Sequence, residues 1–311
     1  MDILVSGSLA YDRIMDFQGR FSDHIMPDKI HMINVSFTVN GMSENFGGTA
    51  GNIAYALSLL GEQPRIVAAI GYDYHRYFQW FEEHGLSTEN ILMVSEEATA
   101  SAYITTDLDD NQITGFNPGA MKHPSGFDFG QTNPQDCIAI VAPGNLKDMA
   151  EYTRAHQQMG IFSIFDPGQS LPAWHSDGLA MCISQSNLLV SNDYELALIK
   201  EKTGLSDHAL LELAGAIVTT KGEQGCEVSN TEGLSVSIPV VPTDKVVDPT
   251  GAGDAFRGGL IKGLIQGLPV ERAAMMGTVC SHYVVQIYGT QTYRFTQDEF
   301  KAKLEQHFGA H

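Results

Sequence analysis

The segment DPTGAGDAFRGG at residues 248–259 places a carboxylate among closely spaced glycines, directly before an apolar helical pattern. The first amides of a helix have no partner inside it, and the helix dipole adds partial positive charge there, so such an end binds phosphate readily. A carboxylate would repel that phosphate unless it accepts a proton from the group that attacks it. The pattern therefore indicates a general base, Asp254, beside an anion hole formed by Gly251, Ala252 and Gly253.

The glycine-rich segment also has a purely structural interpretation. A glycine-rich turn from a strand into a helix, with Asp254 as a first-turn partner of the helix dipole, would also explain a G-x-G spacing. The whole string from Asp248 to Phe256 is far more restrictive than that spacing. The sequence lacks the P-loop pattern GxxxxGK(S/T), so a P-loop is not the route to phosphoryl transfer.

Composition limits the partners of the chain. Its 311 residues include 18 Lys and Arg against 37 Asp and Glu, a net charge of −19 that repels nucleic-acid backbones and anionic membrane surfaces. Hydrophobic residues make up 43% of the chain, which is enough for a folded core. With no signal-peptide pattern and no apolar run near about 18 residues, we expect a cytoplasmic protein that binds small molecules. The four cysteines form no CxxC pair and are expected to be reduced thiols.

Short apolar runs alternate with helical patterns along most of the chain. Because each run is almost continuously apolar, it is typical of a strand buried on both faces of a parallel sheet. The expected strands cover residues 3–7, 65–71, 137–142, 161–166, 187–192 and 216–221. Helical patterns cover residues 49–60, 73–84, 147–158, 193–203, 251–266 and 270–287. This alternation predicts an α/β fold with a doubly wound, mainly parallel sheet.

Two segments break this alternation, residues 13–46 and 97–118. The first contains INVSFTV, and the second contains SAYITTD and QITGFN, which alternate like strands with no helix between them. We expect them to form a small antiparallel β lid that is inserted twice into the core. The core would then comprise residues 1–12, 47–96 and 119–311, with no repeat or low-complexity linker between the parts.

Four motifs, in this order along the chain, resemble those of the PfkB or ribokinase-like kinases. They are GGTAGNIAYALSLLG at 47–61, NDYE at 192–195, TKGEQG at 220–225 and the DPTGAGDAF string already described. The resemblance spans nearly the whole chain. It implies a ribokinase-like fold whose lid covers the acceptor site, and a kinase that uses ATP and Mg²⁺.

The resemblance also implies roles for particular residues. Asp254 would deprotonate an acceptor hydroxyl, and Asp12 would accept hydrogen bonds from two sugar hydroxyls. Taken alone, Asp12 is more typical of a turn after a strand, and its combination with the GG and GN motif favours the binding role. The other expected acceptor residues are Gly47, Gly48 and Asn52.

On the ATP side, the resemblance implies that Glu195 acts on the magnesium ion through water. Taken singly, Glu195 also fits a solvated helix position, and TKG fits a hairpin turn. The expected ATP-binding residues are Asn192, Glu195, Thr220, Gly222 and Gly225.

The wording of three segments, SLAYDRIM, ITGFNPGAM and DPTGAGDAFRGG, looks most like that of bacterial adenosine kinases. A purine needs an aromatic face, which Phe116 in the lid would offer, although lid packing explains this residue equally well. Gln169 would lie near the acceptor. We therefore expect phosphorylation of the 5′ hydroxyl of adenosine to give AMP. The alternatives are a sugar kinase, a kinase of another nucleoside and, from a different class, a catalytically silent ligand-binding regulator.

Two positions near the catalytic motif raise further questions. Pro249 stands where sugar kinases commonly have Thr, which would alter any monovalent-cation site at this loop. Arg257 would either contact phosphate or pair with a carboxylate. Exposed edge strands in the lid would also allow two chains to pair, so a homodimer through the lid is a further expectation.

Overall fold

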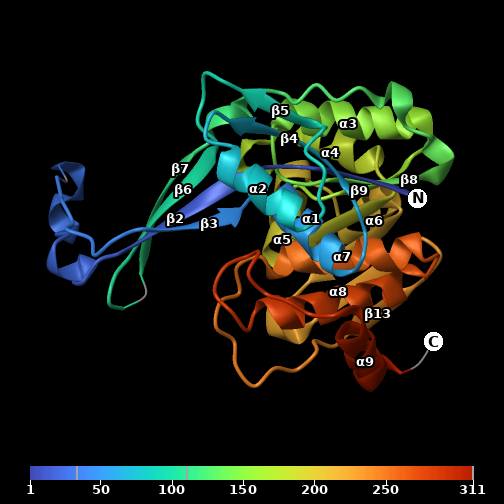
Figure 1. Cartoon of the computed structure of the whole chain (residues 1–311). Coiled ribbons are helices and arrows are strands. Elements are labelled where there is room, and N and C mark those ends of the chain that lie inside the picture. The colour runs from blue at the N-terminus through green and yellow to red at the C-terminus, as the bar shows by residue number, and fades with distance from the viewer. Residues whose placement is uncertain (33, 110, 310–311) are drawn as a thin grey trace.

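A computed structural model describes residues 1–32, 34–109 and 111–309, and one large sheet lies at its centre (Figure 1). Its strands are β1 (Asp2–Ser6), β4 (Arg65–Gly71), β5 (Ile91–Val94), β8 (Cys137–Val141), β9 (Phe162–Phe165), β10 (Leu188–Asn192), β11 (Ala216–Thr220), β12 (Cys226–Asn230) and β13 (Ser235–Ile238). Within the described residues these nine strands have the order β13-β12-β11-β10-β9-β8-β1-β4-β5. The pairs from β11 to β5 are parallel, and β12 and β13 add an antiparallel edge.

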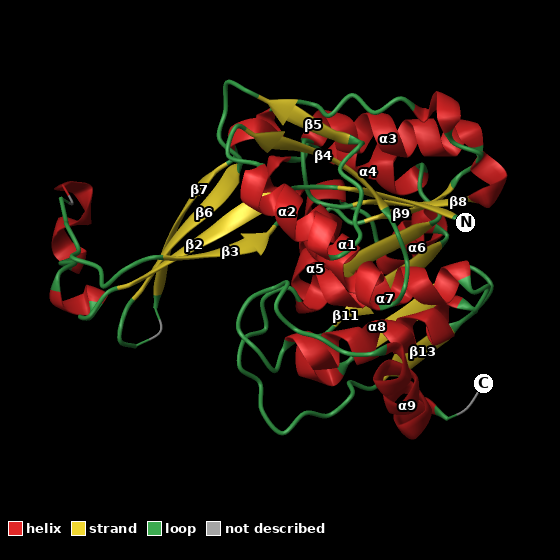
Figure 2. Ribbon diagram, in the orientation of Figure 1, coloured by secondary structure: helices red, strands yellow, loops and turns green. Residues whose placement is uncertain are grey.

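Helices cover both faces of this sheet (Figure 2). They are α1 (Thr49–Leu59), α2 (His75–Glu83), α3 (Leu146–Met159), α4 (Ser176–Ser184), α5 (Asp193–Thr203), α6 (Asp207–Ala214), α7 (Ala252–Ile265), α8 (Val270–Val284) and α9 (Gln297–Phe308). Buried side chains of α1, α2, α7 and α8 pack on one face, and those of α3 to α6 pack on the other. Neighbouring strand residues such as Leu189 and Val190 therefore enter different cores, which explains the continuously apolar runs.

The expected α/β core is confirmed. Every strand expected from an apolar run is present, with its ends shifted by at most one residue. The expected helices are also present, and the last of them ends at Val284. The sequence analysis did not anticipate β5, β12, β13, α4, α6 or α9. For α9 a local signal existed, because Thr296 and Glu299 form a capping box at its start.

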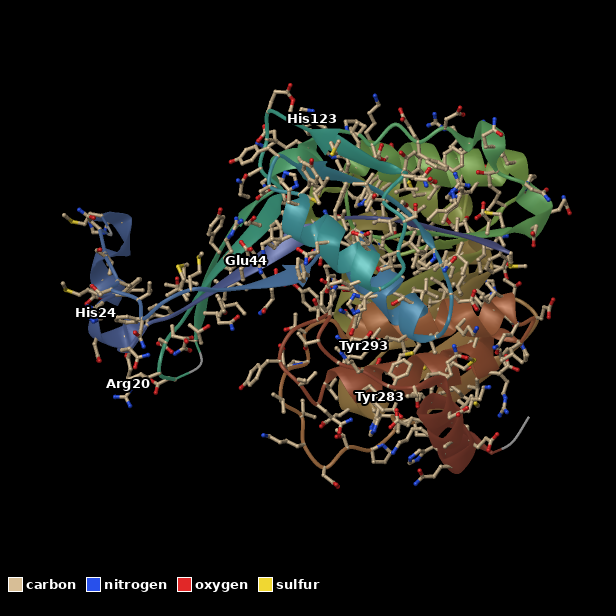
Figure 3. The ribbon with its side chains drawn as sticks, in the orientation of Figure 1. Arg20, His24, Glu44, His123, Tyr283 and Tyr293 are labelled. Atoms are coloured by element: carbon tan, nitrogen blue, oxygen red, sulfur yellow. The ribbon has the colours of Figure 1, made fainter. Side chains whose placement is uncertain are left out.

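The lid is a separate sheet that projects from the core (Figure 1). Its strands are β2 (Ala10–Asp16), β3 (Ser43–Gly47), β6 (Ala100–Thr106) and β7 (Gln112–Asn117), in the order β3-β2-β6-β7. Figure 3 places Arg20 and His24 at its far end and Glu44 near its root. β2 runs parallel to β6, so the expectation of an antiparallel lid is wrong and the sheet is mixed. β2 and β6 are the first strands of the two segments that form the lid. Both run from the core toward the far end of the lid, so they are parallel.

The INVSFTV segment does not form the expected lid strand. Residue 33 lies outside the described residues, and the described residues 34–39 make a single isolated bridge, between Val39 and Phe17. Phe37 instead packs its ring 4.8 Å from that of Phe17, in an aromatic cluster at the far end of the lid. Side-chain packing at this end thus overrides local strand propensity. The residue bounds that divide core from lid stay a prediction.

Candidate active site

The GAG turn lies where a loop enters α7. Gly251 precedes the helix and has φ +80°, a left-handed conformation that would strain any residue with a side chain. Of the expected anion hole, the amide of Ala252 already donates to the carbonyl of Pro249 at 3.2 Å. Among the described residues the amides of Gly251, Gly253 and Asp254 have no hydrogen-bond partner, so this end of the helix offers three free donors to an anion.

Asp254 lies beside these donors. Its Oδ2 accepts a hydrogen bond from Nδ2 of Asn52 at 2.8 Å. Burial of the carboxyl raises its pKa to about 6, although the Arg257 cation and the Asn52 hydrogen bond act in the opposite direction. A carboxyl with this pKa is largely ionised at neutral pH, and it is a stronger base than an ordinary aspartate. These properties suit a general base.

A buried ion pair lies next to Asp254. Arg257, one turn further along α7, donates from Nη2 to Oδ1 of Asp166 at 2.9 Å, and its Nε contacts the other carboxylate oxygen. The two residues are 5% and 1% exposed. A Cβ at Gly253 would lie 2.7 Å from Nη1 of Arg257, so the glycine leaves room for the guanidinium. Of the two roles considered for Arg257, the structure shows the pairing with a carboxylate.

Asn52 on α1 is held by residues that follow α8. Its Oδ1 accepts a hydrogen bond from the hydroxyl of Thr290 at 2.8 Å and another from Nε2 of Gln291 at 2.9 Å. The side chain is 5% exposed. The structure therefore places Asn52 directly against the expected base, and its contact with an acceptor stays a prediction.

The expected acceptor residues of the lid lie in one row across its sheet. Asp12 of β2 pairs with Asn45 of β3 and with Ala102 of β6, and Ala102 pairs with Phe116 of β7. Directly paired residues project from the same face of a sheet. Asp12 and Phe116 therefore share one face, and Asn45 joins them there.

Asp12 and the glycine pair are in close contact at the root of the lid. A Cβ at Gly47 would lie 2.5 Å from Oδ2 of Asp12, and Gly48 has φ +89° in a place where a Cβ would lie 2.6 Å from the carbonyl oxygen of Ser8. Burial, together with the negative charge of Asp248, raises the pKa of Asp12 to about 6. Among the described residues no donor is hydrogen-bonded to this carboxylate, so its oxygens can accept hydroxyls of a ligand.

Phe116 and Gln169 are both open to solvent. Phe116 is 49% exposed on β7, a strand whose six residues are all exposed. Gln169 is exposed in the short helical turn Gly168–Ala173 that follows β9. Within the described chain no hydrogen bond or ring contact joins either side chain to another expected site residue. Their roles toward the acceptor remain predictions.

The expected ATP-binding residues gather where two neighbouring strands end. Asn192 and Thr220 are the last residues of β10 and β11 and pair directly. In doubly wound sheets, ligands bind at the carboxyl ends of the strands. Gly222 and Gly225 lie in the turn after β11 with φ +54° and +85°. Glu195 joins this edge at the start of α5, where it forms a capping box with Asn192.

Glu195 is partly buried and uses one carboxylate oxygen in the capping box. Its Oε2 accepts from the amide of Asn192 at 2.8 Å, which leaves the other oxygen for a water molecule. Burial raises the pKa of Glu195, and the nearby charge of Asp166 adds to this effect. Within the described residues no group of three or more His, Cys, Asp or Glu could hold a metal ion directly. The action of Glu195 on a magnesium ion through water stays a prediction.

The sequence analysis gave no role to Asp166, Thr290 or Gln291. Asp166 follows the apolar run of β9, and a carboxylate at the carboxyl end of a parallel strand is a recognisable signal. No local sequence signal identifies Thr290 and Gln291. Their contacts with Asn52 join residues that are 238 and 239 positions apart in the sequence.

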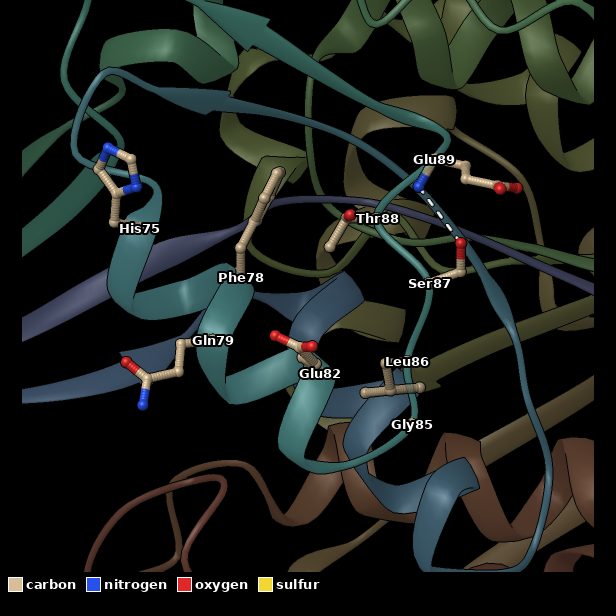
Figure 4. Close-up of a pocket in the computed structure, with 9 residues that line it drawn as sticks. All are labelled: His75, Phe78, Gln79, Glu82, Gly85, Leu86, Ser87, Thr88 and Glu89. Atoms are coloured by element: carbon tan, nitrogen blue, oxygen red, sulfur yellow. Dashed lines mark hydrogen bonds between the residues drawn. The ribbon is translucent and has the colours of Figure 1, made fainter.

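A surface hollow lies apart from this site, between α2 and the loop that follows it (Figure 4). None of the residues that line it is an expected site residue. They are His75, Phe78, Gln79, Glu82, Gly85, Leu86, Ser87, Thr88 and Glu89.

No helix in the described part of the chain combines the length and the apolar character needed to cross a membrane.

Comparisons with known proteins identify the family of the chain. The family model described as "pfkB family carbohydrate kinase" matches residues 9–296. A nucleoside kinase of Methanocaldococcus jannaschii is 30% identical over 279 residues, which cover 88% of this chain and 90% of that protein. Fructokinase-2 of Oryza sativa is 26% identical over 69% of each chain.

Solved structures extend the likeness over almost the full length. The nucleoside kinase of Burkholderia thailandensis in complex with inosine is 39% identical, has a TM-score of 0.87, and covers 99% of this chain and 98% of its own. The same enzyme with ADP and inosine is 40% identical, with a TM-score of 0.84 over 99% and 96% of the two chains. These likenesses confirm the ribokinase-like α/β fold with its small lid sheet. The chain belongs to the pfkB family of carbohydrate kinases and is an ATP-dependent phosphotransferase.

Proposed function

We propose that the chain transfers the γ-phosphoryl group of ATP to the 5′ hydroxyl of a nucleoside, and that adenosine is its preferred acceptor, giving AMP. The observation that carries this proposal is the row across the lid, in which Asp12 and Phe116 share one face. Their strands are separated by β6, so their backbones lie about 10 Å apart. A molecule with both a diol and a flat base spans that separation better than a sugar alone. The inosine complex of the Burkholderia thailandensis enzyme supports a nucleoside acceptor.

In this proposal the buried end of the core carries out the transfer. Asp254 takes the proton of the 5′ hydroxyl, the oxygen bonds to the γ-phosphorus, and the bond from that phosphorus to the leaving oxygen of ADP breaks. The free amides of Gly253 and Asp254 hold charge on the transferring group. Asp12 and the glycine pair hold the ribose, and Phe116 stacks on the base.

ATP would lie along the ends of β10 and β11, against Thr220, Gly222 and Gly225. Magnesium supplies positive charge to the phosphates, and Glu195 would hold one of its water molecules. Asp248, next to Pro249, offers the negative charge that a monovalent cation at this loop would need, although its side chain already accepts from the amides of Thr250 and Gly289.

The lid would also join two chains into a homodimer. β3 and β7 are the edges of the lid sheet, and edge strands carry unpaired backbone groups that can pair with another chain. Light scattering that finds only monomer at micromolar concentration would remove this part of the proposal.

The experiment that tests the proposed function is a panel of acceptors at fixed ATP, with ADP release as the signal. We expect kcat/KM for adenosine to exceed that for ribose and fructose by at least about a hundredfold, which needs only about 2.7 kcal/mol. Inosine and guanosine belong in the panel, because they test the choice of base separately from the choice of nucleoside. A higher value for ribose or fructose would establish the sugar-kinase alternative. No ADP release with any acceptor would favour a silent regulator.

A further inference from the structure

A line of buried polar groups runs from α2 to the expected base. Nε1 of Trp80 donates to Oε1 of Gln291 at 2.9 Å. Nε2 of Gln291 donates to Oδ1 of Asn52 at 2.9 Å and to the hydroxyl of Tyr77 at 2.7 Å. Nδ2 of Asn52 then donates to Asp254 at 2.8 Å. Gln291 and Asn52 are 1% and 5% exposed, so water does not replace a missing partner.

Because the indole nitrogen of Trp80 can only donate, it determines which atoms of Gln291 and Asn52 donate and which accept. An indole nitrogen only donates, so the oxygen of Gln291 must face Trp80 and its nitrogen must face Asn52. The hydroxyl of Thr290 donates to the same end of Asn52, and that end must therefore be its oxygen. The amide hydrogens of Asn52 are left to face Asp254. The opposite orientation would set the Asn52 oxygen against a carboxylate, with no hydrogen between them.

The neighbouring hydroxyls do not replace Gln291. Thr290 has one hydroxyl hydrogen and two acceptors within reach, Oδ1 of Asn52 at 2.8 Å and the carbonyl of Phe46 at 2.9 Å. The hydroxyl hydrogen of Tyr77 is used by a backbone carbonyl at the root of the lid. Whenever the hydroxyl of Thr290 donates to Phe46, Gln291 is the remaining side-chain donor to Oδ1 of Asn52 among these groups.

We propose that Gln291 and Trp80 are positioning residues of the phosphoryl transfer, because they hold Asn52 in the one orientation that donates to Asp254. They act through Asn52 and not by contact with the acceptor or ATP. This inference rests on the proposed role of Asp254 as the base. Loss of either residue should therefore lower turnover while ATP binding is kept.

The pH dependence of turnover reports on this bond. The hydrogen bond from Asn52 favours the ionised form of Asp254 and lowers the pKa that burial raises. Without it that pKa rises, and the acidic limb of the activity profile moves to higher pH. The other titratable groups that face Asp254 are Arg257 on α7, Asp166 after β9, Glu195 on α5, Tyr77 on α2 and Tyr293 after α8. Variants at Trp80 and Gln291 substitute none of these groups, but Gln291→Met also removes the hydrogen bond that Tyr77 accepts, whereas Trp80→Phe does not.

The test compares two variants that break the line at different points. Gln291→Met fills a similar volume and donates nothing, so we expect its acidic limb to move up by about one pH unit, the effect of one hydrogen bond to a charged group. At pH 6 its kcat should fall about fivefold, because the ionised fraction of Asp254 falls from about one half to about one tenth, with the KM for ATP unchanged. Trp80→Phe keeps a ring beside Phe46, on which Trp80 stacks at 5.1 Å, but removes the donor. It should shift the limb in the same direction by a smaller amount.

Tyr55→Phe is the matched control, because it removes a buried 2.6 Å hydrogen bond to the carbonyl of Tyr293 without touching Asn52. The proposal holds if both test variants move the acidic limb and the control does not. It is overturned if folded Gln291→Met and Trp80→Phe keep the wild-type limb, or if the control moves as far. If Gln291→Met does not fold, Trp80→Phe decides in the same way.

Asp254→Asn, measured alongside, separates this inference from the proposed function. Near-normal turnover of Asp254→Asn would show that Asp254 is not the general base. An inactive Asp254→Asn together with unmoved limbs in the other variants would remove only the positioning role.

Discussion

The catalytic end of the core and the face of the lid differ in how far they are assembled before any ligand arrives. In the core, Asp254, Arg257 and Asn52 each have a protein partner, and the ion pair with Asp166 is almost fully buried. On the lid, β7 is exposed along its whole length and Phe116 keeps 49% of its surface open. Figure 3 shows the far end of the lid, with Arg20 and His24, standing clear of the core around Tyr293.

This difference suggests a division of work. Groups that must act with correct charge and angle are held by bonds formed during folding, which avoids reorganisation at the moment of reaction. Groups that choose the acceptor lie on an open surface, where the acceptor itself completes the site. Substitutions in the core should therefore change turnover or stability for every acceptor, whereas substitutions on the lid should change the preference among acceptors.

The largest expected effect lies at the base. Asp254→Asn should lower turnover by roughly two to four orders of magnitude, the usual contribution of a positioned general base. Binding of ATP and acceptor should persist, because the substituted group acts in the transfer step. Steady-state kinetics and calorimetric binding measure the two quantities separately. Turnover close to that of the wild type would show that the buried end does not carry the chemistry.

Next in size is the cost of breaking the buried ion pair. Arg257→Met leaves Asp166 buried without its partner and should lower the free energy of unfolding by about 3–5 kcal/mol. Arg257→Lys keeps the charge but not the two-pronged geometry, so its loss should be smaller. Denaturant unfolding provides the measurement.

The lid offers a matched control for this ion pair. Arg20→Met removes the pair with Asp109, whose side chains are 55% and 48% exposed, and it should leave the unfolding curve unchanged. Equal effects of the two methionine substitutions would contradict the contrast between the assembled core and the open lid.

A smaller effect is expected on the lid face. Phe116→Ala should weaken kcat/KM for adenosine by about 1–3 kcal/mol, the range for a base stacked on an aromatic ring, and should leave ribose almost unaffected. Asp12→Ala should weaken both acceptors, because both present hydroxyls to this carboxylate. Assays of both variants with both acceptors separate recognition of the base from recognition of the sugar hydroxyls. Unchanged adenosine kinetics in Phe116→Ala would show that selection lies elsewhere.

The last expected effect is a fall in activity on the acid side, about tenfold for each pH unit if one carboxylate must be ionised and steeper if two must be. The pKa values of Asp254 and Asp12 are both about 6, and both groups act as anions, so kcat/KM should fall below that pH. Stability should move the other way: a carboxyl whose pKa is raised on folding contributes most stability below its unfolded pKa, and this contribution disappears as the pH rises through about 6. We expect activity to fall below about pH 6 while the circular dichroism spectrum stays constant. A simultaneous loss of structure would contradict this prediction.

The sequence predicted most of the core because its signals are local. Apolar runs located the described parallel strands within one residue, except β5, and the glycines around Asp254 marked a helix start that proved to have free amides. The lid was harder to predict. Pairing of β2 with β6 joins residues 90 positions apart, as Ala10 with Ala100, and no local pattern states whether such strands run parallel.

The support of the site depended even more on contacts distant in sequence. The G-N motif was recognised, but Asp254, which accepts a hydrogen bond from Asn52, lies 202 positions away. Gln291 stands in an irregular segment after α8, where neither periodicity nor a turn motif marks it. Composition gave no hint that Arg257 and Asp166 would pair, because burial decides that pairing and burial emerges only from packing.

The contact between Gly47 and Asp12 has a consequence for laboratory evolution of this chain. Since any Cβ at Gly47 would collide with the Asp12 carboxylate, the two positions cannot be varied independently. In a library that randomises residue 47 alone, almost every member should fail before its acceptor preference can be seen. A library that combines a shorter side chain at residue 12 with alanine at residue 47 would avoid this collision. Variants that prefer a different acceptor should be sought in that library.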